Sequence, residues 1–85
     1  MAEKRLVGKV THYYPKIGVA VIDVLDEIKI GDRISIEGAT TNFEQVVESM
    51  EIEHKKIEVA KAGDKIGLKV IDRVREKDNV YKILE

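Results

Sequence analysis

IKIGDRISIEG, at residues 28–38, is a phrase that the chain of 85 residues nearly repeats as AKAGDKIGLKV, at residues 60–70. Each copy has a Gly-Asp pair, then one basic residue, then apolar residues at alternating positions. Such alternation is typical of a β-strand with one buried face. The repeated phrase therefore predicts, at two places along the chain, a strand that begins directly after a turn.

The predicted turns are Gly31-Asp32 and Gly63-Asp64. Glycine adopts a positive φ without steric cost, and an aspartate carboxylate can accept hydrogen bonds from nearby backbone N–H groups. We therefore expect these four residues to have structural roles in equivalent turns. An alternative stays open: two ordinary turns resemble each other by chance, because their flanking sequences differ and the phrase has no third copy.

Three other segments have strand patterns, and a fourth pattern contains the strand of the second copy of the phrase. Apolar and polar residues alternate over residues 4–14 and again over residues 64–72. Residues 18–25 form a continuous run rich in β-branched residues, and residues 80–84 form a short closing strand. Turn signals separate these segments, with PKIG after the first and RVREKDN before the last.

Residues 43–58 are ambiguous from local signals. One helical face would carry six largely apolar residues, and Glu, Gln, Met and Lys favour helix; these six are Phe43, Val46, Val47, Met50, His54 and Ile57. A strand through the same residues would need a bulge or a change of face. The length of the chain predicts one domain over residues 1–85. With a strand here, six strands predict a small antiparallel barrel or sandwich.

The composition argues against several classes of protein. The chain has 15 basic and 16 acidic residues, so its formal net charge is −1 and it lacks the basic excess of a dedicated nucleic-acid binder. The chain has no cysteine, which excludes disulfides and thiolate chemistry. No apolar run approaches the roughly 18 residues of a membrane span, and no secretory signal begins the sequence. The expected location is the cytoplasm, without a membrane.

Three stretches resemble a known domain: GVAVIDVLDEIKIGDRISIEG, VESMEIEHKKIEVAKAGDKIGLKV and VYKI. They resemble the second domain of translational GTPases such as elongation factor Tu, and the related barrel appended to U32-type peptidases. The resemblance covers about residues 6–84, which it implies to be the core of the domain. The positions that match the pattern are Gly31, Gly38, Ala62, Gly63, Gly67 and Leu68. The resemblance implies an all-β, six-stranded, closed antiparallel Greek-key β-barrel of the translation-factor domain 2 type, and it makes residues 43–54 a strand.

The departures from that pattern shape the expected function. No G-x-x-x-x-G-K-[ST] loop is present, so we expect no GTP binding. We also expect the barrel to stand without a peptidase segment before it. The resemblance then implies a stand-alone, non-catalytic binding module, linked to translation through RNA or a translation factor. The alternative is a protein–protein adaptor that works with a separately encoded enzyme such as a U32-type peptidase.

The stretch HYYPK is the polar segment most suggestive of binding. It places His12, Tyr13 and Tyr14 beside Lys9 and Lys16. Aromatic rings flanked by cations can stack bases and neutralise phosphates, and tyrosine is also enriched at protein interfaces. The structural alternative is that both tyrosines pack as a cap on the barrel. These five residues are the candidate binding residues for a protein partner or RNA, with neither partner favoured decisively.

Two further candidates come from the resemblance. In elongation factors the second domain helps to hold the aminoacyl end of tRNA, with a basic residue on the long strand and an acidic residue after the "AG". His54 and Asp64 stand at these positions, although histidine is mostly neutral at pH 7. We expect no metal or cofactor, because the two histidines lie in different segments without an H-x-x-x-H spacing. We expect no enzymatic activity, because no G-x-S-x-G motif surrounds a serine.

Overall fold

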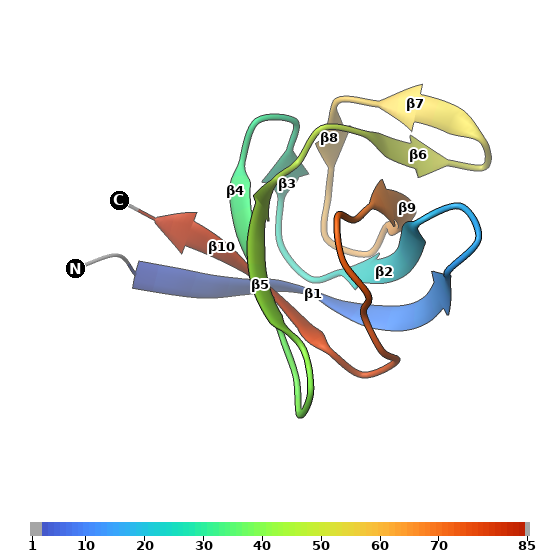
Figure 1. The fold of residues 1–85 in the computed structure, drawn as a ribbon. Coiled ribbons are helices and arrows are strands. Elements are labelled where there is room, and N and C mark those ends of the chain that lie inside the picture. The colour runs from blue at the N-terminus through green and yellow to red at the C-terminus, as the bar shows by residue number, and fades with distance from the viewer. Residues whose placement is uncertain (1–2, 85) are drawn as a thin grey trace.

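All the regular secondary structure in the chain is β-strand (Figure 1), within a computed structural model that describes residues 3–84. The strands are β1 (Glu3–Tyr14), β2 (Val19–Val24), β3 (Ile28–Lys29), β4 (Arg33–Glu37), β5 (Asn42–Val46), β6 (Met50–Ile52), β7 (Lys55–Ile57), β8 (Val59–Ala60), β9 (Lys65–Lys69) and β10 (Asn79–Leu84). The all-β fold predicted from sequence is confirmed. Within residues 3–84, no helix has the length and apolar character that a membrane span requires.

Residues 43–58 contain most of β5 and all of β6 and β7, three short strands, so the helical alternative is wrong. The apolar side chains that seemed to form one helical face enter the core from separate pieces of chain. Val47 and Met50 are fully buried, and Phe43 and Ile57 pack against the core from partly buried positions. Turns and bends between the strands change which side chains point inward, which is why no single strand period was visible in the sequence.

Eight strands form one antiparallel sheet, in the order β5-β4-β10-β1-β2-β9-β6-β7, and β3 pairs with β8 in a second, two-stranded sheet. β1 is the longest strand, with 12 residues, and it pairs with β10 on one side and β2 on the other. Register shifts fall between Leu6 and Gly8 and between Val10 and His12. Such bulges increase the local twist, which lets one long strand take part in a strongly coiled sheet.

The six-stranded closed barrel expected from sequence is not confirmed. Residues 3–84 form ten strands, and β5 and β7, at the two ends of the large sheet, do not pair with each other. The buried Gln45 side chain links β5 to the segment after β9. Its Nε2 donates to the Lys69 carbonyl at 2.8 Å, and its Oε1 accepts from the Ile71 N–H at 2.9 Å. A side chain thus makes a link for which a closed barrel would use a backbone ladder.

The repeated Gly-Asp phrase forms the same turn twice, and a third turn repeats its geometry. We name them turn A (residues 29–32), turn B (residues 61–64) and turn C (residues 75–78). In each, the fourth residue is an aspartate whose Oδ2 accepts the N–H of the first residue, at 2.8, 2.9 and 2.8 Å. The third residue has φ of 94° at Gly31, 95° at Gly63 and 75° at Lys77. The sequence hides the third copy because a lysine takes the glycine position.

Each turn is clamped to one buried valine by two backbone hydrogen bonds. The third residue of the turn donates to the valine carbonyl, and the valine N–H donates to the aspartate carbonyl, at 2.8 Å in all six cases. Turn A holds Val47, turn B holds Val24 and turn C holds Val10. The turns therefore connect strands that are distant in sequence, so their aspartates and glycines are part of the framework.

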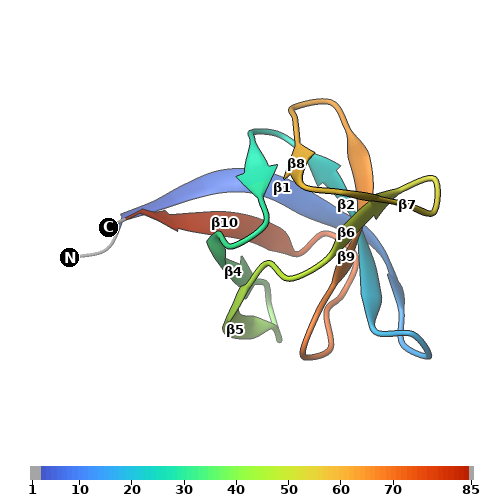
Figure 2. The same ribbon diagram turned by 90° about the horizontal axis from the view of Figure 1, so that it is seen from above.

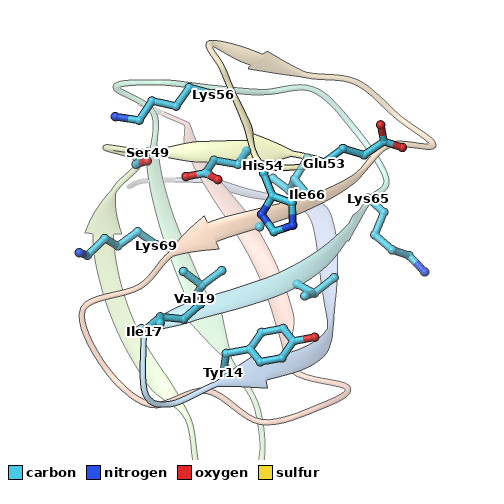
Figure 3. A pocket seen from close by; sticks show the side chains of 13 residues that line it. Tyr14, Ile17, Val19, Ser49, Glu53, His54, Lys56, Lys65, Ile66 and Lys69 are labelled. Carbon is cyan, nitrogen blue, oxygen red and sulfur yellow. The ribbon is translucent and has the colours of Figure 1, made fainter.

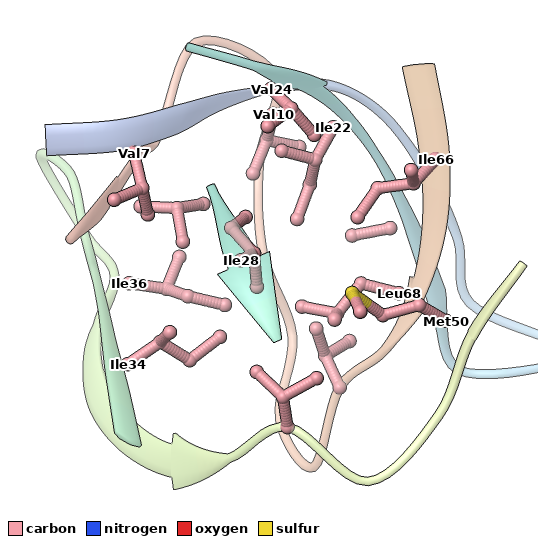
Figure 4. Packing of buried hydrophobic residues seen from close by; sticks show 14 of the residues in the cluster. Val7, Val10, Ile22, Val24, Ile28, Ile34, Ile36, Met50, Ile66 and Leu68 are labelled. Atoms are coloured by element: carbon pink, nitrogen blue, oxygen red, sulfur yellow. The ribbon is translucent and has the colours of Figure 1, made fainter. Parts of the chain in front are cut away.

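The core lies between the coiled sheet and the small β3–β8 sheet (Figure 4). Ile28 on β3 is fully buried in the midst of side chains from β1, β2, β4 and β9. The largest fully buried side chains are aliphatic: Ile22, Ile28, Ile34, Ile36, Met50, Ile66, Leu68, Val7, Val10, Val24, Val47 and Val80. Burial on this scale suits a small domain with no disulfide to supplement its core.

The start of β1 and the end of β10 lie side by side as a two-stranded ribbon. Glu3 pairs with Leu84, and Lys4 pairs with Ile83. Figure 2 shows this ribbon at one end of the molecule, with the β1–β2 turn and β7 at the other end. The longest dimension of the molecule is 36 Å. The β1–β2 and β6–β7 hairpins are therefore remote from the end at which the described chain begins and finishes.

Candidate functional site

A groove of about 540 Å³ lies between the β1–β2 and β6–β7 hairpins. Figure 3 shows its two sides, with Tyr14 and Ile17 on one and the His54 hairpin on the other. The residues that line it are Tyr14, Ile17, Val19, Val21, Ser49, Glu51, Glu53, His54, Lys56, Lys65, Ile66, Gly67 and Lys69. The groove therefore combines an apolar surface with a charged margin.

The floor of the groove is formed by the outward face of β2 and β9. Val19 and Val21 alternate with buried residues of β2, so they face away from the core. On β9, Gly67 is the pairing partner of Val21 of β2, and it contributes no side chain. A Cβ placed on Gly67 would lie 3.2 Å from the Val19 Cγ1 atom, which is tighter than ordinary contact. Glycine here leaves room for the Val19 side chain on the floor of the groove.

The β1–β2 hairpin supplies the first wall. His12 and Tyr14 share one face of β1, with ring centroids 4.4 Å apart in an edge-to-face arrangement. Tyr13 points to the opposite face and packs against the core. At the tip, Ile17 is 63% exposed and Tyr14 is 47% exposed. The hairpin thus presents two large apolar groups to solvent. Exposed apolar side chains that adjoin each other are typical of contact surfaces, whereas single exposed ones are common anywhere on a protein.

The β6–β7 hairpin supplies the second wall through an unusual turn. Glu53 and His54 have φ of 50° and 66°, so two consecutive non-glycine residues are left-handed. Hairpin turns of this kind normally use Asn-Gly, because β-carbons resist positive φ. Left-handed non-glycine residues cost about 1 kcal/mol or more each, and such strain clusters at functional sites. The turn places His54 at the groove at a cost in hairpin stability.

Charged side chains surround the apolar floor. Lys56, Lys65 and Lys69 contribute three positive charges, and Glu51 and Glu53 contribute two negative charges. Lys65 Nζ lies 3.8 Å from the Asp23 Oδ1 atom, a weak exposed pair. The groove carries charges of both signs, which suits an extended polypeptide better than a phosphate backbone.

The shifted pKa values belong to a pair outside the groove. Lys4 Nζ donates to the Glu37 Oε2 atom at 2.6 Å, and the Ser35 hydroxyl donates to the same oxygen at 2.7 Å. The hydrogen bond from Lys4, followed by that from Ser35, lowers the pKa of Glu37. The same bond to Glu37 raises the pKa of Lys4. This pair links β1 to β4 and has no contact with the groove residues.

The structure brings together two of the residues proposed from sequence, Tyr14 and His54. Lys9, Lys16 and Tyr13 do not line the groove. His12 stands beside Tyr14, and its Nδ1 lies 3.4 Å from the Glu76 Oε2 atom. Asp64 is also outside the groove, because its carboxylate accepts the Lys61 N–H within turn B. Of the two candidates that the elongation-factor resemblance implies, His54 lines the groove and Asp64 does not.

Sequence reasoning missed the apolar half of the groove. Ile17, Val19, Val21 and Gly67 read as ordinary turn and strand residues. The available signal was Ile17, an isoleucine at the tip of a predicted turn, where burial is unattainable. In the part of the chain that the structure describes, no group of three His, Cys, Asp or Glu side chains could hold a metal ion.

Comparisons with known proteins give relatives that are much longer than this chain. No family model matches. An uncharacterized protease of Methanocaldococcus jannaschii is 46% identical over 80 residues, which cover 93% of this chain and 20% of the relative. A collagenase of Porphyromonas gingivalis is 37% identical over 82 residues, which cover 94% of this chain and 23% of the relative. The chain thus spans about a fifth of the length of these curated relatives.

Solved structures extend the likeness to the whole fold. The C-terminal domain of a putative U32 peptidase of Geobacillus thermoleovorans, as its selenomethionine variant, superposes with a TM-score of 0.86 at 23% identity, over 89% of this chain and 96% of that one. A second structure of this domain gives 0.86 at 24% identity. The comparisons do not show the expected resemblance to elongation factor Tu. They support the second expected resemblance: this chain has the fold of a U32 peptidase C-terminal domain.

Proposed function

We propose that this chain is an accessory domain that acts with a U32-type peptidase, and that its groove binds a protein segment. One observation carries the proposal. The fold matches a domain that belongs to such a peptidase over nearly the full length of both chains. The relatives named protease and collagenase support it, because the match falls in one fifth of their length. The rest of those proteins would then supply the peptidase activity.

The contents of the groove suit binding better than catalysis. Ser49 and His54 both line it, yet no hydrogen bond joins the Ser49 hydroxyl to the imidazole in the described residues. Nucleophilic catalysis needs a base within reach of the nucleophile and a third group that orients the base. Tyr14 and Ile17 are instead exposed side chains of the kind that anchor protein interfaces. We therefore propose that the domain itself is non-catalytic.

The test is binding between this chain and the separately produced catalytic part of a U32-type peptidase from the same source. Calorimetry would compare the wild-type chain with the double variant Tyr14→Ala, Ile17→Ala. Leu25→Ala is a matched control, because Leu25 is 53% exposed and lies outside the groove. We expect the groove variant to bind about tenfold more weakly, since truncating an interface anchor typically costs more than 1 kcal/mol. The control should bind like the wild type.

A translation-linked role would give a different result. RNA binding depends on phosphate contacts, so its affinity falls steeply as salt rises. Binding to RNA with that salt dependence, together with no detectable binding to the peptidase part, would contradict the proposal. Equal losses of affinity in the groove variant and the Leu25→Ala control would contradict the assignment of the groove.

A further inference from the structure

A second concavity, of about 310 Å³, lies on another part of the surface. One wall is the loop of the β4–β5 hairpin, with Thr40 and Asn42, and the other is the segment that precedes turn C, with Asp72, Arg73 and Arg75. Arg73 and Arg75 flank the buried Val74, so they leave the core on the same side of the chain. Two guanidinium groups thus face one small polar hollow.

The two walls of this concavity are fixed to each other. Gly38, at the start of the β4–β5 loop, lies against the buried Asp78, and a Cβ on Gly38 would collide with the Asp78 carboxylate. The same carboxylate accepts the Arg75 N–H at 2.8 Å. Within the loop, the Gly38 N–H donates to the Thr41 carbonyl at 2.7 Å. The loop and the arginine segment therefore meet in a defined geometry, so the hollow exists before any ligand arrives.

Comparison of the three equivalent turns isolates what is special about this place. All three begin with a basic residue, at Lys29, Lys61 and Arg75. In turn A, the residue two positions earlier is Glu27, whose Oε2 lies 3.2 Å from the Lys29 Nζ atom. In turn B that position is the apolar Val59. In turn C it is Arg73. The turn geometry explains one exposed basic residue at most, and it leaves the second positive charge and the use of arginine unexplained.

The two guanidinium groups are available to a ligand. No carboxylate within residues 3–84 forms an ion pair with Arg73 or Arg75. Asp72 also lines the concavity, and its Oδ1 accepts the backbone N–H of Arg73 at 2.7 Å. The hollow is therefore lined by two positively charged arginines and one negatively charged aspartate, so its net charge is positive.

We propose that this concavity binds a phosphate group. Arginine presents a planar fork of N–H donors that matches the oxygens of phosphate, and two forks can hold several oxygens at once. The Thr40 hydroxyl and the Asn42 amide offer neutral donors on the opposite wall. Asp72 reduces the attraction, so binding is reversible and weak. The site is separate from the groove and does not depend on the function proposed for it.

The test is an NMR titration of the isotopically labelled chain, which at 9.6 kDa gives resolved amide signals. Inorganic phosphate and O-phosphoserine would be compared with acetate at equal ionic strength. We expect saturable shifts at Thr40, Asn42, Arg73 and Arg75 with both phosphate probes, and weaker binding of acetate. Equal binding of the two phosphate probes indicates recognition of the phosphate group itself. Tighter binding of O-phosphoserine indicates that the hollow also contacts the group that carries it.

Three variants and one matched control make the test specific. Arg73→Gln and Arg75→Gln should each weaken phosphate binding by about twofold to fivefold, as expected for exposed ion pairs. Asp72→Asn should tighten it by a similar factor. Lys61→Gln is the matched control, because it removes the same charge from the equivalent position of turn B and should change nothing. Equal weakening in Lys61→Gln, no saturable shifts, or no strengthening in Asp72→Asn would overturn the proposal. The unfolding temperature of each variant confirms that the fold is retained.

Discussion

The third position of each turn shows how much one residue contributes to this fold. Gly31, Gly63 and Lys77 all have positive φ, yet only the first two are glycine. A Cβ on Gly31 or Gly63 would meet no atom within 4 Å, so glycine is favoured there by the positive φ alone. Lys77 accepts a left-handed conformation, which costs an L-residue about 1–2 kcal/mol. Turn C is therefore the strained member of the three.

Exchanging the residue type at this position should change stability in opposite directions. We expect Gly63→Ala to lower the free energy of unfolding by about 1 kcal/mol, because alanine meets only the φ penalty. Lys77→Gly should raise it by about 0.5 kcal/mol, since the removed strain outweighs the added freedom of the unfolded chain. Urea unfolding measures both. A loss of stability in Lys77→Gly would show that the lysine side chain, and not its backbone, matters in turn C.

The three turn aspartates should rank by their surroundings. Among the described residues, the Asp64 side chain bonds only within its turn, so Asp64→Ala should cost about 1 kcal/mol. Asp32 also lies 3.1 Å from the Lys82 Nζ atom in a half-buried pair, so Asp32→Ala should cost somewhat more. Asp78 is 5% exposed and fills the space against Gly38, so Asp78→Ala should cost about 2–3 kcal/mol. Thermal unfolding of the three variants gives the order, and equal losses would contradict it.

The Lys4–Glu37 pair predicts a small dependence of stability on pH. Because folding lowers the pKa of Glu37, this carboxylate stabilises the fold above its unfolded value of 4.5. That contribution is lost as pH falls through the lowered pKa. Glu37→Gln should therefore lose stability at pH 7 and approach the wild type near pH 2. The effect should be small, because both side chains are partly exposed. A difference that persists at low pH would indicate a packing role instead.

At the scale of elements, the β6–β7 hairpin combines poor turn chemistry with a place in the groove. Replacing Glu53-His54 by Asn-Gly would supply residues that favour two consecutive positive φ values. We expect the free energy of unfolding to rise by about 1–2 kcal/mol, because two strained residues are relieved. Affinity for the protein partner should fall, because the His54 side chain is removed from the groove. Calorimetry gives the unfolding temperature and the affinity of the same sample.

Equal affinity in this variant would show that the strained turn serves no binding role. Lower stability would show that Glu53 or His54 makes contacts that offset the strain. The single variant Glu53→Asn, which keeps His54, is the control that separates the two effects.

Strand periodicity predicted the elements with one clear buried face. The alternation in residues 64–72 corresponds to β9, where Ile66 and Leu68 are buried. Residues 43–58 were ambiguous because three short strands share that stretch, and each connection between them resets the side-chain period. Within HYYPK, alternation along β1 separates Tyr13, which packs on the core, from Tyr14, which reaches the groove. The sequence identifies such residues as candidates, but it does not predict which other strands lie next to them in the fold.

The groove shows the same limit most clearly. Val19 comes from β2, Gly67 from β9 and His54 from the β6–β7 turn, and only strand order brings them together. The third turn was hidden for a different reason: its geometry tolerates Lys77, so the sequence signal of glycine is lost while the hydrogen bonds remain. The turns at the two Gly-Asp pairs could be predicted because the sequence shows both the glycine and the aspartate.

At the scale of the whole molecule, the ribbon of β1 and β10 and the groove occupy opposite ends (Figure 2). Three clamps between turns and buried valines tie the strands that lie between them. The clamps therefore connect the groove end of the molecule to the ribbon end.

The measurement that tests the central claim most directly is mapping of the contact surface on this chain. Labelled chain would be titrated with the unlabelled catalytic part of a U32-type peptidase from the same source, and its amide signals followed by NMR. The account predicts shifts or broadening concentrated at Tyr14, Ile17, His54 and Gly67, with turn B unaffected. Signals that stay unchanged throughout, or changes concentrated on the β1–β10 ribbon with the groove untouched, would contradict it.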